Sequence, residues 1–168
     1  SAYFGTSSTP DPVQFLVGKV TYANPGQIAS LAMGGSTAKT STPTALFTLN
    51  EGYDNIQRAV SDSVKEGSTT LFSQTRTYDN VGNVLGLSTS TVAQSGGTVS
   101  ENEAFCYDAL NRLVWAGNTG TPTGGDHCMS LPSVNGVSSY TQINNYDSLD
   151  RFTSGLAGGN YQYDGNHV

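Results

Sequence analysis

The sequence predicts an all-β fold made of antiparallel β-hairpins, and three observations support this class. Turn-forming residues are abundant, with 20 glycines among 168 residues. Charged residues make up only 12% of the chain, whereas an average globular protein has about a quarter. A short motif that starts at a tyrosine recurs along the chain, and stretches rich in threonine, serine and valine separate its copies.

The tyrosine motif occurs six times. Its pattern is Tyr-Asp, two variable residues, then Gly, Asn or Asp, then Arg or another polar residue, and finally an apolar residue. The copies begin at Tyr22, Tyr53, Tyr78, Tyr107, Tyr146 and, in shortened form, Tyr163. Their spacing is irregular, with insertions between copies and not inside them, which is typical of hairpins joined by loops that tolerate changes in length.

Each motif predicts a tight turn. Aspartate favours the first position of a type I turn, because its carboxylate accepts backbone N–H groups of the turn. The aspartates at this position are Asp54, Asp79, Asp108, Asp147 and Asp164. The residue that ends the turn must tolerate left-handed backbone geometry, which suits Gly26, Gly82, Asn111 and Asp150. Gln57 suits this position poorly, so we expect a distorted turn after Tyr53.

A three-residue hairpin loop would also set cross-strand neighbours. Aspartate and the arginine four positions later would then pair on one sheet face, as Asp54 with Arg58, Asp108 with Arg112 and Asp147 with Arg151. Each tyrosine would face the apolar residue six positions later on the other face. These pairs are Tyr22 with Ile28, Tyr78 with Val84, Tyr107 with Leu113 and Tyr146 with Phe152.

The segments that flank the motifs predict strands at 69–77, 84–92, 98–106 and 113–116. The sequence Val134-Asn135-Gly136-Val137 predicts a further two-residue hairpin. A competing interpretation applies around the second motif, where Ile56, Ala59, Val60 and Val64 lie at helical spacing and could form a short amphipathic helix.

The two cysteines, Cys106 and Cys128, favour a disulfide in a chain so rich in Ser, Thr and Gly, while two free thiols remain the alternative. Trp115 lies two positions after Leu113, so we expect it on the same face as Tyr107. If that face met solvent, Trp115 could stack on sugar rings. The alternative is that the motif tyrosines line a packed face.

The motifs, especially 107–113 and 161–166, resemble the YD repeats of the RHS family, found in bacterial surface and toxin proteins and in the related teneurins. The resemblance covers residues 17–168, leaving 1–16 as a lead-in segment, and implies a repeat region truncated at its C-terminal end. It implies antiparallel hairpin repeats in a curved sheet, as a segment of an RHS β-shell. The chain departs from the family in lacking a toxin segment and an Asp-Pro-rich autoprotease stretch, and in having too few repeats to close a shell.

This resemblance implies a non-catalytic structural segment of a large bacterial protein that is secreted or displayed at the cell surface. Its partners would be the rest of the parent chain and an enclosed C-terminal toxin or other cargo. The alternative is an adhesion module whose loops, such as 117–140, recognise a glycan or protein on another cell.

Composition and motifs argue against other function classes. The net charge of −6 and the lack of Lys/Arg clusters disfavour nucleic acid, and no apolar run reaches the ~18 residues of a membrane span. His127 and Cys128 adjoin Asp126, but adjacent side chains on a strand point to opposite faces, which disfavours a catalytic dyad. His127 and His167 lie far apart without a metal-ligand pattern, and the repeated acids are turn residues. We therefore expect no catalytic centre, metal or cofactor.

Overall fold

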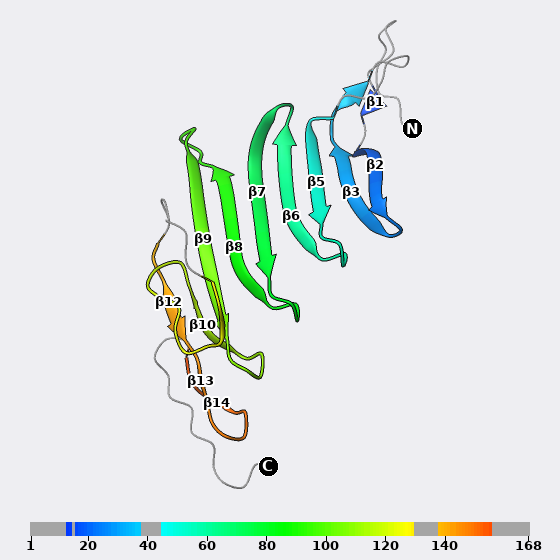
Figure 1. The fold of residues 1–168 in the computed structure, drawn as a ribbon. Helices are drawn as coiled ribbons and strands as arrows, with labels where there is room; N and C mark the ends of the chain where they lie inside the picture. Colours follow the sequence, from blue (N-terminus) through cyan, green and yellow to red (C-terminus); the bar gives the residue numbers. More distant parts are fainter. Residues whose placement is uncertain (1–12, 15, 38–44, 130–137, 156–168) are drawn as a thin grey trace, which may run out of the picture. The chain divides into compact units, whose positions relative to one another are not determined.

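The computed structural model describes residues 13–14, 16–37, 45–129 and 138–155. Every regular element in these residues is a β-strand, and the strands of the main sheet are antiparallel neighbours in near-sequential order (Figure 1). The predicted all-β class with antiparallel hairpins is therefore confirmed. No helix long and apolar enough to cross a membrane occurs in the part of the chain that the structure describes.

The chain divides into two compact units, and strands β7 and β8 each have residues in both of them. The first unit comprises residues 1–75 and 91–96. In its sheet the strands follow the order β2-β3-β5-β6-β7, while β1 pairs with β4 separately. The bounds are β1 Val13–Gln14, β2 Val17–Asn24, β3 Gln27–Met33, β4 Ser36–Thr37, β5 Phe47–Tyr53, β6 Ala59–Glu66 and β7 Thr69–Tyr78.

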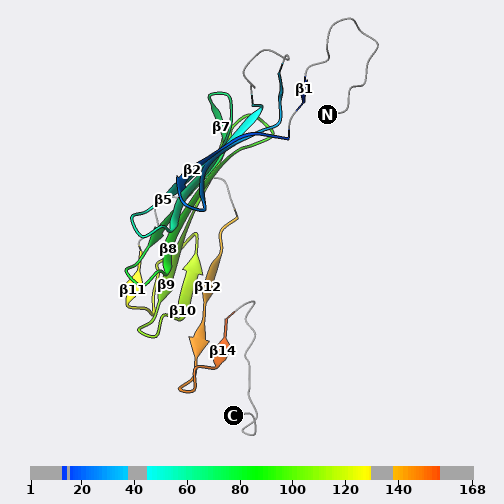
Figure 2. The same ribbon diagram turned by 90° about the vertical axis from the view of Figure 1, so that its right-hand side faces the viewer.

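The second unit comprises residues 76–90 and 97–168. Its strands follow the order β8-β9-β10-β12, with β11 also paired to β9 and with β13 and β14 forming a separate hairpin. Figure 2 shows β12 alongside β10, as the register of Trp115 with Ile143 requires. The bounds are β8 Val84–Val92, β9 Thr98–Tyr107, β10 Leu113–Gly117, β11 His127–Cys128, β12 Thr141–Ile143, β13 Asn145–Tyr146 and β14 Phe152–Ser154.

The observed strands agree with the sequence expectations for β7 to β10 to within one residue at each end. They are rich in β-branched residues, which fit the half-buried surface of a pleated sheet. The helical alternative for the stretch after Tyr53 is wrong, because residues Ala59–Glu66 form β6 and pair with β5. The hairpin expected at 134–137 and the sixth motif at Tyr163 and Asp164 lie outside the described residues.

The buried core of the described residues is small and lies in the second unit. It consists of Ala104, Cys106, Val114 and Trp115, with Tyr146 packed against them. Asn118, 1% exposed, borders this region. Its Nδ2 donates to Glu101 Oε1 and to the Ser138 carbonyl, both at 3.0 Å, and its Oδ1 accepts the Tyr140 N–H at 2.8 Å. Both the nitrogen and the oxygen of the Asn118 side chain therefore have hydrogen-bond partners, and this buried polar side chain links the end of β10 to the segment before β12.

The position of Trp115 corrects a sequence expectation. Leu113 pairs with Tyr107, but the register shifts after Leu113, so Trp115 pairs with Cys106 and not with a residue of the Tyr107 row. A bulge of this kind adds one residue to one strand and thereby changes which face the following side chains occupy. Trp115 therefore lies in the buried cluster with Ala104 and Cys106 and not on the face of Tyr107.

Gly117 provides a test of the packing at the end of β10. A Cβ at this position would lie 2.8 Å from the Tyr140 carbonyl oxygen and 3.0 Å from the Trp115 ring. We expect Gly117→Ala to lower the free energy of unfolding by about 1–3 kcal/mol, because backbone or ring must move to admit the methyl group. Urea unfolding measures this. Gly97→Ala is the matched control, since a Cβ there has no atom within 4 Å, and an equal loss in both variants would contradict the packing described.

Candidate functional site

The tyrosine motifs form the repeated feature from which a site can be built, because each described copy closes a hairpin. The tyrosine pairs with the residue six positions later in four of them. These pairs are Tyr22 with Ile28, Tyr53 with Ala59, Tyr107 with Leu113 and Tyr146 with Phe152. Tyr78 ends β7, directly before the turn of the third copy.

Three of the turns share one arrangement of atoms, shown by Asp108. Its backbone N–H donates to the Arg112 carbonyl at 3.0 Å, and its own carbonyl accepts the Asn111 N–H at 2.9 Å. Its Oδ1 accepts the N–H groups of Leu110 and Arg112, and its Oδ2 accepts Arg112 Nε at 2.7 Å. Asp54 with Arg58 and Asp147 with Arg151 repeat this pattern, with each Nε–Oδ2 distance again 2.7 Å.

The turn after Tyr53 is not distorted, so that expectation is wrong. Gln57 adopts a left-handed φ of 71°, close to the 61° of Asn111 and the 62° of Asp150. Its N–H donates to the Asp54 carbonyl at 3.0 Å, as in the other two turns. The hydrogen bonds of the hairpin therefore hold a poorly suited residue in the geometry that a type I turn with a following bulge requires.

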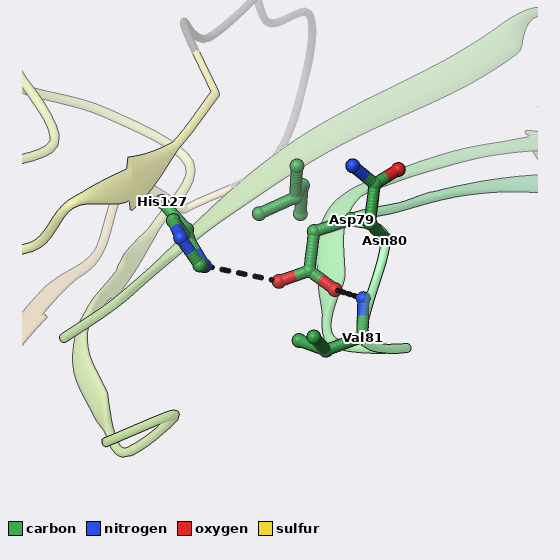
Figure 3. Close-up of a pocket in the computed structure, with 5 residues that line it drawn as sticks. Asp79, Asn80, Val81 and His127 are labelled. Carbon is green, nitrogen blue, oxygen red and sulfur yellow. Dashed lines mark hydrogen bonds and ion pairs between the residues drawn. The ribbon is translucent and has the colours of Figure 1, made fainter. Parts of the chain in front are cut away.

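The third turn differs from these three, because Asn83 occupies the arginine position. Asp79 Oδ1 accepts the N–H groups of Val81, Gly82 and Asn83 at 2.8–3.0 Å, and Oδ2 accepts Asn83 Nδ2 at 2.8 Å. His127 Nδ1 lies 3.3 Å from the same Oδ2. Figure 3 shows the imidazole and the carboxylate facing one another beside a shallow pocket. Its lining is Asp79, Asn80, Val81, Leu85 and His127.

Tyrosine hydroxyl groups also join neighbouring motifs within each unit. In the first unit, the Tyr53 hydroxyl donates to the carbonyl of Ile28, the residue that closes the preceding motif, at 3.0 Å. In the second unit, the Tyr146 hydroxyl makes the equivalent bond to Leu113 at 3.0 Å. The motif tyrosine therefore fastens its hairpin to the one before it.

The turns themselves are linked as well. Gln27 Nε2 donates to the Gln57 carbonyl at 2.9 Å in the first unit. In the second unit, Asn83 Nδ2 donates to Asn111 Oδ1 at 2.9 Å. Arg112 lies 4.6 Å above the centre of the Tyr146 ring and donates through its Nη1 to Asp150 Oδ1 at 2.5 Å. Polar residues of the motifs therefore serve both their own turn and the next one.

The turn carboxyls have lowered pKa values. For Asp54, Asp79 and Asp108, removal from water by itself raises the pKa, but the hydrogen bonds from the turn N–H groups and from Arg58, Asn83 or Arg112 outweigh it. For Asp147 the largest cause is the hydrogen bond from the backbone N–H of Arg151, which lowers the pKa. The folded hairpins therefore favour ionised turn aspartates.

One set of exposed residues was not predicted to matter. The fourth motif position carries a large apolar side chain in four described copies, and each projects from its turn into solvent. These residues are Ile56 at 61% exposed, Val81 at 66%, Leu110 at 62% and Leu149 at 68%. The sequence contains a sign of this feature, because Ile, Val or Leu recurs at an exposed turn position where a polar residue would be expected.

Cys106 and Cys128 form a disulfide, which anchors the strap, defined here as residues 125–129. The strap pairs with β9 through His127 opposite Tyr107 and Cys128 opposite Cys106. Since both sulfurs are in this bond, Cys128 is no thiol nucleophile for His127. In the described residues, no group of three or more His, Cys, Asp or Glu side chains is arranged to hold a metal ion.

The interpretation of Trp115 as a sugar-stacking platform needs correction. Its side chain is fully buried, with 1% of the residue exposed, so its ring has no free face. Among the motif tyrosines that the structure describes, Tyr22 is exposed at 64%, while Tyr53, Tyr78, Tyr107 and Tyr146 are half-buried. No family model matches the chain, and no curated protein matches it.

Gln57 allows a test of the turn geometry. Because a left-handed φ is costly for a residue with a Cβ and free for glycine, Gln57→Gly is expected to raise the free energy of unfolding by about 0.5 kcal/mol. The reverse type of change at the equivalent position, Gly82→Ala with φ of 105°, is expected to lower it by about 1 kcal/mol. Denaturant unfolding of both variants tests this, and a loss of stability in Gln57→Gly would contradict it.

The lowered pKa of Asp108 predicts a pH dependence of stability. A carboxyl whose pKa is lower in the folded state stabilises the fold fully above its unfolded pKa, near 3.8, and loses that contribution as pH falls through the folded pKa. We expect stability to decline below about pH 4, and less steeply in Asp108→Asn than in the parent chain. Urea unfolding between pH 6 and 2 measures this, with Ala109→Ser on the same turn as control. Parallel profiles for all three proteins would refute it.

Proposed function

We propose that this chain is a non-catalytic structural repeat segment, a stretch of sheet wall in a larger secreted or surface protein of the RHS/YD-repeat type that encloses a toxin or other cargo. The main support for the proposal is that the motif side chains make structural hydrogen bonds and ion pairs. Within each unit, the tyrosine, aspartate and arginine side chains join a hairpin to itself or to its neighbour. Residues used in this way build an array of repeats, since each repeat is stabilised by the next.

The pocket beside Asp79 gives little support for an enzyme. Asp79 is already bound to three turn N–H groups, to Asn83 and to His127. Its role in shaping the turn accounts for its contacts, and His127 is the other titratable group in the pocket lining. The described residues that line the pocket include no serine, threonine or cysteine that could serve a hydrolase as nucleophile.

Adhesion is the second candidate, and the exposure of Tyr22 favours it. An aromatic side chain 64% exposed at the beginning of a motif turn can stack on a sugar or pack against a protein. A glycan array probed with the purified chain and with Tyr22→Ala tests this candidate. Specific binding that is lost in the variant would favour adhesion over a purely structural role.

The wall proposal predicts that additional repeats stabilise the sheet. In a tandem fusion of two copies of this chain, we expect β2 of the second copy to gain a strand neighbour from the first. Its backbone amides should then exchange with solvent at least about tenfold more slowly than in the single chain. Hydrogen exchange read by mass spectrometry measures this, and a fusion joined by a long Gly/Ser linker is the control. Equal exchange rates in the fusion and the single chain would count against the proposal.

A further inference from the structure

The strap fits closely against the strands beneath it. A Cβ at Gly125 would lie 2.4 Å from the Tyr107 carbonyl oxygen and 2.9 Å from Cys106 Sγ, so this position has room only for glycine. The next N–H along the strap, that of Asp126, donates to the same Tyr107 carbonyl at 3.0 Å. At the other end of the strap, Met129 Sδ lies 3.2 Å from Thr77 Oγ1 and would be 3.0 Å from a Cβ at Gly86. Two glycines therefore make room for the strap.

His127 adds a polar side-chain contact to this fit. Its imidazole reaches Asp79 in the one described Asp-led turn that has no arginine at the last polar position, where Asn83 stands instead. The strap thus supplies, from a distant part of the sequence, a nitrogen donor to a carboxylate that the other turns pair with their own arginine. The imidazole is 45% exposed, and its Nδ1 lies 3.3 Å from the carboxylate oxygen. Such an exposed contact orients the strap but holds it only weakly.

The two cysteines of the disulfide differ in their access to solvent. Cys106 is 0% exposed and lies among Ala104, Val114 and Trp115. Cys128 is exposed at the surface of the strap. A thiolate attacks a disulfide at a sulfur that it can reach, and the other sulfur is the leaving group. The burial of Cys106 therefore dictates which of the two can be attacked.

We propose that the Cys106–Cys128 disulfide is an exchange site for thiols, at which an incoming thiolate attacks Cys128 Sγ. A bond forms between the incoming sulfur and Cys128, the bond to Cys106 breaks, and its electron pair leaves with Cys106 Sγ. The Cys106 thiolate then takes a proton from water, because the apolar side chains around it disfavour the charge. No oxidant or reductant other than the incoming thiol is consumed. Cys106 can reverse the step by attacking the new mixed disulfide.

This exchange would release the strap. Without the covalent link, the strap is held to the rest of the unit by a two-residue strand pairing, the Asp126 N–H bond to the Tyr107 carbonyl, the His127–Asp79 contact and the packing of Met129. Its departure exposes the Tyr107 carbonyl and the pocket beside Asp79, so thiol exchange converts a covered segment of β9 into an open one. The incoming group is a low-molecular-weight thiol or a protein thiol, which share this chemistry.

The test uses the full chain with its disulfide intact. The chain is incubated with reduced glutathione, quenched in acid, alkylated and mapped by peptide mass spectrometry. We expect glutathione on Cys128 and the alkyl group on Cys106, together with a change in the emission of Trp115, the single tryptophan of the chain. Glutathione found mainly on Cys106 would overturn the proposal. So would the absence of any adduct under conditions in which the urea-unfolded chain reacts completely. A parallel arm with a reduced protein dithiol of the thioredoxin type distinguishes the two thiol sources by their relative rates.

Two variants test whether the strap limits the exchange. Gly125→Ala should disturb the fit of the strap and raise the rate of adduct formation by about tenfold, and Thr123→Ala, just outside the strap, is the matched control. His127→Gln keeps the strap sequence otherwise intact, so it serves if Gly125→Ala fails to fold, and a rise of about threefold is expected. Rates equal to that of the parent chain in both variants would contradict a strap whose contacts hold Cys128 in place against Cys106.

Discussion

The carboxylate at the beginning of each described Asp-led turn is the interaction on which the hairpins depend. It accepts N–H groups that the tight turn would otherwise leave without partners, and it orients the arginine or asparagine that follows. In two of these turns that residue also reaches the next turn, as Arg112 does to Asp150 and Asn83 does to Asn111. Formation of one turn therefore positions a side chain that can donate a hydrogen bond to the neighbouring turn.

The small core explains why so many polar contacts are needed. The fully buried apolar residues of the described chain gather around Cys106 and Trp115, while the other strands bury their side chains only in part. A single sheet of half-buried strands gains little from apolar packing compared with a sandwich of two sheets. Tyrosine hydroxyls, turn carboxylates and buried amides such as Asn118 make up part of that difference through hydrogen bonds.

Local features could be predicted from the sequence, and features that depend on distant contacts could not. The turns at Asp54, Asp108 and Asp147 follow from residues within one motif, so their register was predictable. The geometry at Gln57 was not, because the paired strands impose it against the preference of that residue. The face of Trp115 depends on a bulge of one residue that the alternation of side chains does not reveal. The contact of His127 with Asp79 joins segments far apart in the chain, although Asn83 in an arginine position was a visible signal.

The departure of the third motif from the others has a wider meaning for repeat sequences. When one repeat has a shorter residue where its neighbours use arginine for their own closure, the carboxylate of that turn can also contact another segment, as Asp79 contacts His127. An irregularity in an otherwise regular array then marks where a loop attaches, and comparing motifs within a single chain can locate such an attachment point without any related sequence. Restoring the regular residue, as in Asn83→Arg, would place a guanidinium and the His127 imidazole in competition for one carboxylate and so turn a point of attachment back into an ordinary repeat.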